Sequence, residues 1–342
     1  MFLDVLFGVL PLFFVMIVGY AASYAPKFPS SVEPALNVFV FYVALPALLY
    51  KVVAQADASG GVPMDFLGAA AGAALVFALF SWAVFRYVLR LENSQSLAGM
   101  LTTSFGNVSY LGIPVILGVM GPQAGLAAGM GQLVHNVIFM VGFPILAQIV
   151  LPSAGGRGHR PSGARMMRTV RNALLYSPVT WSMLIGGAVL VFSLDVPKPL
   201  DDTVDLLAGA AAPGALFVIG MSLRRTIERS VRRKPAATKP AVTEGLVKSK
   251  VRGSKTALGV MVLGKLLALP LLTVLCLELF APQLPDIWFN TAVLMAAMPT
   301  SATAYIMAQN DTGDGEPTAM AIVITCILSL VALPVLAALV LR

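Results

Sequence analysis

The feature of this sequence that most constrains its fold is a succession of long apolar runs separated by short polar segments. A helix needs roughly 20 mainly apolar residues to cross the hydrocarbon core of a bilayer. We identify ten such runs, at 5–24, 34–54, 66–88, 95–119, 123–151, 173–194, 200–223, 256–280, 286–308 and 317–341. Charged residues make up 11% of the chain, against about 25% in a soluble domain, so most of the surface must face lipid. The sequence therefore predicts an all-α polytopic membrane protein with ten transmembrane helices.

Basic residues are concentrated in three of the connections between these runs. Arg86 and Arg90 lie at or just beyond the end of the third run, five arginines follow the fifth, and eleven lysines and arginines lie between 224 and 255. Because basic loops stay on the cytoplasmic side, we expect both termini on the periplasmic side of a bacterial inner membrane. A basic stretch also suits nucleic acid or anionic lipid. We interpret these stretches as topology signals, and expect membrane lipid and no nucleic acid as a partner.

Each half of the chain holds five runs, so the second half must cross the membrane in the opposite sense to the first. The halves divide as a first five-helix repeat at 1–151, a cytoplasmic basic linker at 152–172, and a second five-helix repeat at 173–342 that contains the basic loop 224–253. We therefore predict two inverted repeats.

Prolines interrupt the second and fourth helix of each predicted repeat. Pro46 and Pro114 lie 68 residues apart (114 − 46), and Pro213 and Pro299 lie 86 apart (299 − 213). The longer basic loop of the second half accounts for the difference. Inverted repeats with helices broken at matching positions are typical of secondary transporters whose site lies near the membrane midplane. We expect helices 4 and 9 to be broken and to cross.

The two expected breaks combine proline with small polar residues. Proline has no N–H, so the carbonyls of Tyr110 and Met295 should lose their helical donors. Crossing half-helices would point their positive N-terminal ends at one spot, which suits an anion. The neutral hydrogen-bonding candidates there are Asn107, Ser109, Thr300, Ser301 and Thr303, and Tyr305 closes the same run. The freed carbonyls could hold a cation instead, or the polar groups could bond only to neighbouring helices.

Helix 5 carries Gln132, His135 and Asn136, which share one helical face. His135 is a candidate for proton coupling, with a neutral histidine bonded to a neighbouring helix as the alternative. Lys265 lies about ten residues into helix 8. Its side chain could reach back toward the cytosol, attract an anionic substrate, or pair with a carboxylate.

The sequence contains no motif for catalysis, cofactor binding or metal binding. Cys276 and Cys326 both lie in apolar runs, where buried, inert thiols are expected. We expect a protein that is not an enzyme and that has no cofactor. A coupling ion, either a proton or sodium, stays a candidate.

Five segments of the chain resemble the auxin efflux carrier family, whose bacterial members include malonate-type transporters. The segments are 36–49 in helix 2, 106–114 in helix 4, 176–178 at the start of helix 6, 265–270 in helix 8 and 298–305 in helix 9. The match extends over nearly the whole chain. A resemblance to bile acid sodium symporters is more distant and concerns topology.

The resemblance implies a scaffold of helices 1, 2, 6 and 7 and a moving transport domain of helices 3–5 and 8–10. It implies a substrate at the crossover, with Asn107, Pro114 and Pro299 at the site and Ser109 and Tyr110 beside it. Plant members carry Asn-Pro-Asn in helix 4, whereas this chain carries Phe-Gly-Asn. A small carboxylate is therefore the expected substrate, and auxin is not.

Together these observations predict an elevator-type secondary transporter of a small organic anion, with a homodimer as a candidate assembly. The alternative is a membrane sensor or channel that binds its ligand without coupled transport. Saturable counterflow would distinguish a carrier from a channel.

Overall fold

The computed structural model describes residues 2–29, 31–56, 61–151, 171, 177–232 and 255–340. This part of the chain is helical, with no extended strand. Its elements are α1 (Phe2–Ala22), α2 (Val32–Phe39), η1 (Val40–Ala44), α3 (Leu45–Ala54), α4 (Met64–Ala83), η2 (Val84–Val88), α5 (Asn93–Ser104), η3 (Val108–Gly112), α6 (Ile113–Met120), η4 (Pro122–Ala124), α7 (Gly125–Asn136), η5 (Val137–Gly142), α8 (Phe143–Val150), α10 (Pro178–Phe192), α11 (Lys198–Gly209), α12 (Ala211–Arg232), η6 (Gly264–Ala268), α14 (Leu269–Phe280), α15 (Asp286–Ala297), α16 (Ala302–Thr312) and α17 (Glu316–Val340). A further helical segment, 255–263, leads into η6.

Helical segments lie in each of the ten apolar runs. Within the described residues, six helical segments are long and apolar enough to cross a membrane. They are Val32–Ala54, Met64–Val88, Pro122–Val150, Lys198–Glu228, Lys255–Phe280 and Glu316–Leu339. Val9–Ala22, Val108–Met120 and Pro178–Phe192 are shorter apolar helices. The prediction of an all-α polytopic membrane protein is thus confirmed.

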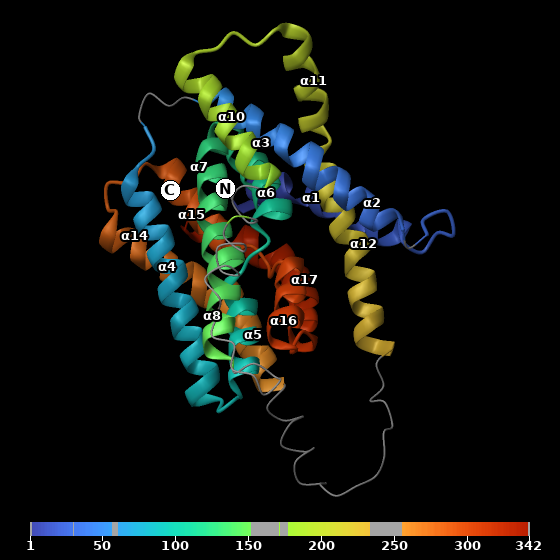
Figure 1. The fold of residues 1–342 in the computed structure, drawn as a ribbon, viewed down its shortest axis with the longest axis vertical. Coiled ribbons are helices and arrows are strands. Elements are labelled where there is room, and N and C mark those ends of the chain that lie inside the picture. The colour runs from blue at the N-terminus through green and yellow to red at the C-terminus, as the bar shows by residue number, and fades with distance from the viewer. Residues whose placement is uncertain are drawn as a thin grey trace, which may run out of the picture.

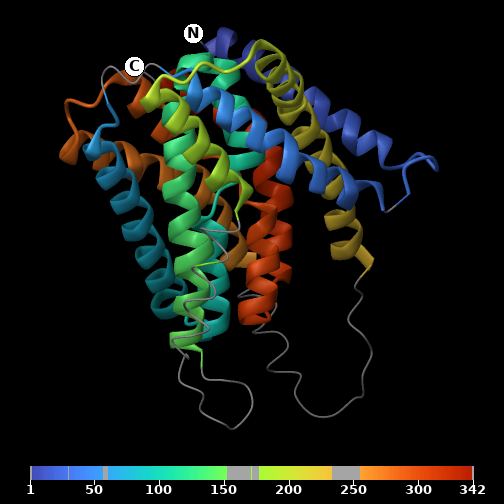
Figure 2. The ribbon, with the colours of Figure 1, turned by 45° about the horizontal axis from the view of Figure 1, so that its top comes forward.

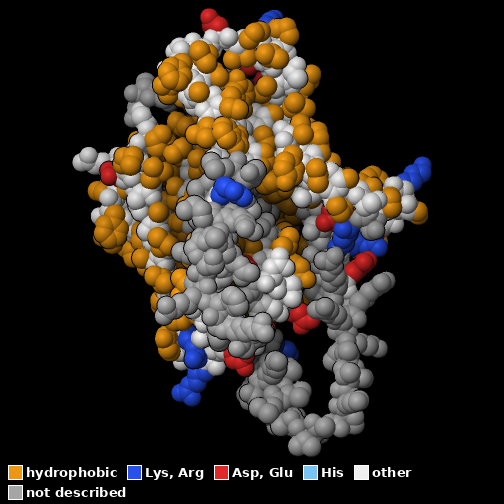
Figure 3. All heavy atoms as spheres, viewed as in Figure 1, with side chains coloured by type: hydrophobic (Ala, Val, Ile, Leu, Met, Phe, Trp, Pro, Cys, Tyr) orange, Lys and Arg blue, Asp and Glu red, His pale blue; other side chains and the backbone are white. Residues whose placement is uncertain are grey.

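The outer surface has the character expected of a chain surrounded by lipid. Leu271, Leu275 and Leu279 form a stripe along α14, and each is more than half exposed. Hydrophobic side chains cover much of the face shown in Figure 3. Apolar surface of this extent is not found on soluble monomers, and it marks the faces that meet hydrocarbon.

The helices pack in two sets. In one set, α1 packs on α12, and α3 packs on α10 and α11. In the other set, α4 packs on α5 and α14, α7 packs on α15, and α16 packs on α5. Figures 1 and 2 show α2 and α12 on the opposite side of the molecule from α4 and α14.

Glycines allow the backbones of the first set to approach closely. A Cβ built on Gly19 in α1 would lie 2.2 Å from the carbonyl oxygen of Phe217 in α12. A Cβ built on Gly186 in α10 would lie 2.7 Å from the carbonyl oxygen of Tyr50 in α3. The two contacts are related by one shift in numbering, because 186 − 19 and 217 − 50 both equal 167. Pro46 and Pro213 differ by the same 167 residues.

Several prolines are accommodated by wide helical turns. Among the described residues, four π-helical turns each end two residues before a proline: η1 before Pro46, η3 before Pro114, η5 before Pro144 and η6 before Pro270. A proline removes one N–H and crowds the preceding turn, and a π turn relieves both effects by widening the backbone. Before each of these prolines the backbone therefore changes locally from α-helical to π-helical hydrogen bonding, and the helix continues.

The positions of two breaks differ from the sequence-based expectation. Helix 4 is interrupted at 105–107, well before Pro114, which lies in the first turn of α6. Helix 7 is interrupted at Ala210, before Pro213. The register argument that paired Pro114 with Pro299 was therefore wrong, because the π turn absorbs the effect of Pro114.

One predicted boundary also shifts. The loop expected to begin at 224 starts later, because α12 continues to Arg232. Two ion pairs involve the basic C-terminal part of α12. Arg225 pairs with Glu33 at 2.9 Å, and Arg224 pairs with Glu228 at 2.7 Å. The rest of that loop, nearly all of the 152–172 linker and the start of the 173–194 run lie outside the described residues.

Candidate functional site

The two broken helices meet at their breaks. Gly106 and Thr300 form an isolated antiparallel β-bridge. The N–H of Asn107 donates to the carbonyl of Pro299 at 2.8 Å, and the N–H of Ser301 donates to the carbonyl of Phe105 at 3.0 Å. The unwound segments thus satisfy each other's backbone groups, as buried irregular backbone must.

The backbone N–H groups of the two bridged residues donate hydrogen bonds to side chains on α7 and α17. The N–H of Gly106 donates to Nε2 of His135 at 3.1 Å, and the N–H of Thr300 donates to Oγ1 of Thr325 at 3.2 Å. An accepting Nε2 places the ring proton of His135 on Nδ1, so this imidazole is neutral. Its ring also packs against Phe105 and Phe139, with centroids 5.1 and 4.8 Å away, and these two phenyl rings contact each other at 5.4 Å.

Thr300 and Ser301 hold the crossing together. Oγ1 of Thr300 donates to the carbonyl of Thr102 at 2.9 Å, and Oγ1 of Thr102 lies 2.8 Å from Oγ1 of Thr318. The hydroxyl of Ser301 caps α16 by accepting from the N–H of Thr303 at 3.2 Å. These groups were expected to offer hydrogen bonds to a ligand, and the structure uses them within the protein.

Asn107 is differently placed. It is the N-cap residue of η3, it is 8% exposed, and its side-chain amide has no recorded hydrogen bond within the described residues. The N–H groups of Val108 and Ser109 likewise have no recorded acceptor in the described part of the chain. The start of η3 therefore combines an unbonded amide with free N–H groups at the positive end of a helix.

Tyr110, the next polar residue of η3, contacts the first set of helices. Its hydroxyl donates to Oδ1 of Asn37 on α2 at 2.9 Å. Its ring packs against a buried cluster formed by α3, η1 and α12. Tyr110 therefore connects the crossing to α2, and its hydroxyl is already engaged.

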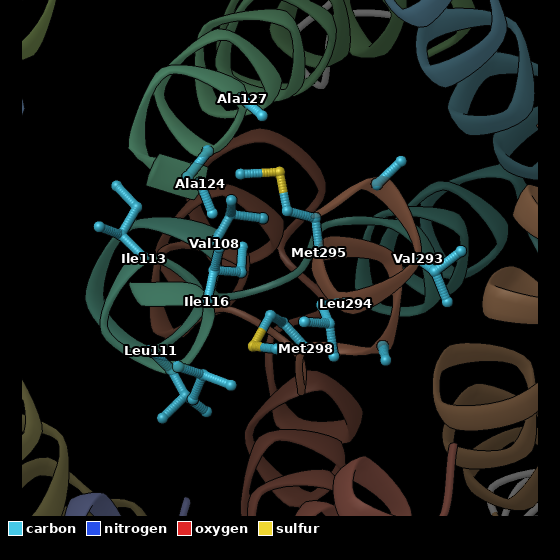
Figure 4. Packing of buried hydrophobic residues seen from close by; sticks show 14 of the residues in the cluster. Val108, Leu111, Ile113, Ile116, Ala124, Ala127, Val293, Leu294, Met295 and Met298 are labelled. Carbon is cyan, nitrogen blue, oxygen red and sulfur yellow. The ribbon is translucent and has the colours of Figure 1, made fainter. Parts of the chain in front are cut away.

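The crossing rests on apolar packing from both breaks. Figure 4 shows Val108 and Leu111 of the η3 turn near Met295 and Met298 at the end of α15. Gly112 lies close to this cluster, since a Cβ there would come within 3.2 Å of Cγ of Met298. Any ligand at Asn107 therefore meets a wall that is mostly hydrophobic.

The expectation of a free carbonyl at Met295 was wrong, and the structure also contradicts one of the three alternatives for Lys265. The carbonyl of Met295 is not free, because it accepts from the N–H of Met298 at 3.3 Å. Lys265 does not reach toward the cytosol. Its side chain is fully buried, and Nζ donates to the carbonyl of Ala296 at 3.0 Å. Lys265 belongs to the π turn η6, and its side chain points into the interior, where it reaches a carbonyl at the C-terminal end of α15.

A small cavity of about 50 Å³ lies behind the crossing, among α4, α7, α14 and α15. Ser104 and His135 line it, and the hydroxyl of Ser104 is buried without a partner in the described structure. Gln132 is also fully buried with both amide atoms unbonded there. Asn136 is half-buried, with no recorded side-chain hydrogen bond among the described residues.

The other predicted site residues are distributed as follows. Pro299 contributes its carbonyl to the bridge, and Pro114 is buried in α6. Tyr305 lies on α16 near Gly315 in the loop before α17. Sequence reasoning missed Thr102 and Ser104, although both stand out as hydroxyl residues at the end of an apolar helix.

A lipid-facing helical bundle with two broken helices paired at their backbones has the features of a membrane transport protein. A model of the family described as "Membrane transport protein" matches residues 4–337. The chain therefore belongs to this family, the auxin efflux carrier family. Its members are membrane transporters and not enzymes.

Curated relatives agree with this assignment. The "Putative malonate transporter" of Rhizobium meliloti (strain 1021) is 27% identical over 321 residues, covering 94% of this chain and 91% of the relative. An "Uncharacterized transporter" of Methanothermobacter thermautotrophicus is 23% identical over 331 residues, or 95% of each chain. The "Uncharacterized transporter YfdV" of Escherichia coli (strain K12) is 23% identical over 218 residues, covering 63% of this chain and 67% of the relative.

Proposed function

We propose that this protein is a secondary active transporter of a small organic anion, with a carboxylate as the substrate. The observation that carries the proposal is the open N-terminus of η3, where the amide of Asn107 and the N–H groups of Val108 and Ser109 have no partner in the described structure. Oriented N–H groups at a helix start favour an anion, and the carboxamide adds a directed donor. The corresponding start of α16 is capped by its own Ser301.

Charge supports an anionic substrate. Lys265 is buried near the crossing, and no carboxylate pairs with it in the described part of the chain. A lysine side chain in a membrane interior that has no carboxylate partner favours a negative ligand nearby. The relative from Rhizobium meliloti is named for malonate, a small dicarboxylate, which makes malonate the first probe to use.

We propose ten transmembrane helices in two inverted repeats, within the inner membrane and with both termini periplasmic. The paired contacts at Gly19 and Gly186 support the repeat, since one shift of 167 residues relates both partners. The bridge supports it as well. In each half, the N–H of the bridged residue donates to a side chain of the next helix, at His135 and at Thr325.

The mechanism we propose is of the elevator type. The set containing α1, α3, α10 and α12 serves as the scaffold, and the set around the crossing moves against it. The backbone hydrogen bonds between the breaks would keep both half-helices together during that movement. The contact of Tyr110 with Asn37 would be exchanged for another as the substrate crosses.

The test uses purified protein in proteoliposomes, with labelled malonate first and then other small mono- and dicarboxylates. Saturable counterflow is the expected result. In Asn107→Ala, loss of one hydrogen bond worth about 1–3 kcal/mol should weaken affinity on the order of 5- to 100-fold. Asn310→Ala, which alters an exposed asparagine on α16, is the control and should bind as wild type does. Unchanged affinity in Asn107→Ala would place the site elsewhere.

A further inference from the structure

The buried lysine at the crossing lies where a helix presents its negative end. Lys265 belongs to η6, and its Nζ donates to the carbonyl of Ala296 at 3.0 Å. Ala296 is the penultimate residue of α15, so its carbonyl is among those left without a partner by the end of the helix. The C-terminal end of a helix carries partial negative charge, which an ammonium group neutralises.

The break in helix 4 provides the space for this ammonium group. A Cβ on Gly106 would lie 2.9 Å from Nζ of Lys265 and 3.3 Å from its Cε. Gly106 is fixed by the bridge to Thr300 and by the hydrogen bond to His135. The cation is therefore enclosed between the carbonyl end of α15 and the unwound backbone of helix 4.

A buried charge without a counter-ion must be stabilised by something other than an ion pair. Lys265 has a carbonyl as its hydrogen-bond acceptor, and the described residues provide no carboxylate for it. His135, the neighbouring titratable group, accepts a hydrogen bond at Nε2 and is neutral. Unwound backbone and the C-terminal ends of half-helices are where transporters coordinate sodium or protons.

We infer that the ammonium group of Lys265 is a resident cation, which occupies the place of a free coupling cation at the crossing. The wild-type protein should then need no sodium to stabilise this region. Removing the ammonium group should create a vacant site for a small monovalent cation. The inference concerns the same crossing as the proposed function, but its test measures stability and requires no substrate, so either one can fail alone.

The experiment compares thermal unfolding of purified wild type, Lys265→Ala and Lys255→Ala in choline chloride, sodium chloride and methylammonium chloride at equal ionic strength. Lys255 is exposed at the start of the same helical segment and provides the control. Wild type and Lys255→Ala should show the same midpoint in all three salts. Lys265→Ala should unfold on the order of 5 °C lower in choline chloride. At least half of that loss should be recovered in sodium or methylammonium chloride.

Two results would overturn the inference. One is a wild-type midpoint that rises in sodium chloride but not in choline chloride, which would reveal a sodium site that Lys265 does not fill. The other is a Lys265→Ala protein whose midpoint equals that of wild type in choline chloride, or whose loss no cation recovers. If Lys265→Ala cannot be purified, the comparison of the wild-type midpoint in sodium chloride and in choline chloride still tests the inference.

A second variant tests the same site without removing the lysine. Gly106→Ala should displace the ammonium from Ala296 and lower the midpoint of thermal unfolding in choline chloride. Gly259→Ala, whose Cβ meets no atom within 4 Å, is the matched control. A Gly106→Ala protein with wild-type stability in choline chloride would contradict the enclosed cation.

Discussion

Replacing Gly186 by alanine should destabilise the protein, whereas the same change at its neighbour Gly187 should not. The Cβ added at Gly186 would lie 2.7 Å from the carbonyl oxygen of Tyr50, and ordinary contact begins at 3.4 Å, so α10 and α3 must separate by 0.7 Å (3.4 − 2.7). A Cβ at Gly187 meets no atom within 4 Å.

The magnitudes follow from these contacts. Overpacking of a tight interface costs about 1–3 kcal/mol. Alanine in an open helical position gains about 0.5–1 kcal/mol over glycine. The midpoint of thermal unfolding of Gly186→Ala should therefore lie on the order of 5 °C below that of Gly187→Ala. Purified protein in one detergent, followed by a fluorescent thermal-shift assay, is sufficient to measure the difference.

The equivalent position in the first half extends this prediction. Gly19→Ala requires a separation of 1.2 Å (3.4 − 2.2) between α1 and α12, so its loss of stability should equal or exceed that of Gly186→Ala. Equal midpoints for Gly186→Ala and Gly187→Ala would refute the close approach of the helices. A harmless Gly19→Ala beside a damaging Gly186→Ala would refute the equivalence of the two contacts.

Three further changes examine the crossing and the topology. Thr300→Val removes the hydrogen bond to the carbonyl of Thr102 and should lower stability by about 1–3 kcal/mol, measured by thermal unfolding, while Thr300→Ser should retain most of it. His135→Gln should keep an acceptor for the N–H of Gly106 and fold normally; if His135 couples protons, the pH dependence of uptake should disappear, and an unchanged pH profile would leave His135 a structural role. A cysteine at Ala237 should be shielded from a membrane-impermeant thiol reagent in intact cells, and labelling from outside would reverse the proposed orientation.

The helices could be predicted from the sequence because lipid imposes a simple requirement on composition. A run of about 20 apolar residues in a chain this poor in charge has few alternatives to a helix. The expected burial of Cys276 and Cys326 is confirmed. The grouping of helices into a scaffold and a moving set stays a prediction.

The positions of the breaks were less predictable, because proline has two structural outcomes. Pro299 lies within a break, whereas Pro114 follows a π turn and leaves its helix intact. No local pattern distinguishes these cases. The outcome depends on whether a partner segment is present to satisfy the unwound backbone, and the partners of 105–107 lie nearly 200 residues away, at 299–301.

The role of Lys265 was missed for a related reason. From the sequence, a lysine about ten residues into a span can reach water by extending its side chain. Its acceptor, the carbonyl of Ala296, lies on the next helix and cannot be recognised from residue type, since every residue has a carbonyl. Likewise, the sequence does not reveal that the missing side chain of Gly106 leaves room for the ammonium group.

The pairing of the two breaks has a consequence for how this family can diversify. The hydrogen bonds from Asn107 to Pro299 and from Ser301 to Phe105 join main-chain atoms only. Mutation at Asn107 can therefore change the side chain presented at the crossing while the main-chain pairing that positions it is kept. Selection for a new substrate could act on a few side chains while the architecture is inherited unchanged. If the proposed site at the start of η3 is right, a mutational library limited to Asn107 and Ser109 should yield variants with altered ligand preference while Asn107 keeps its main-chain hydrogen bond to Pro299.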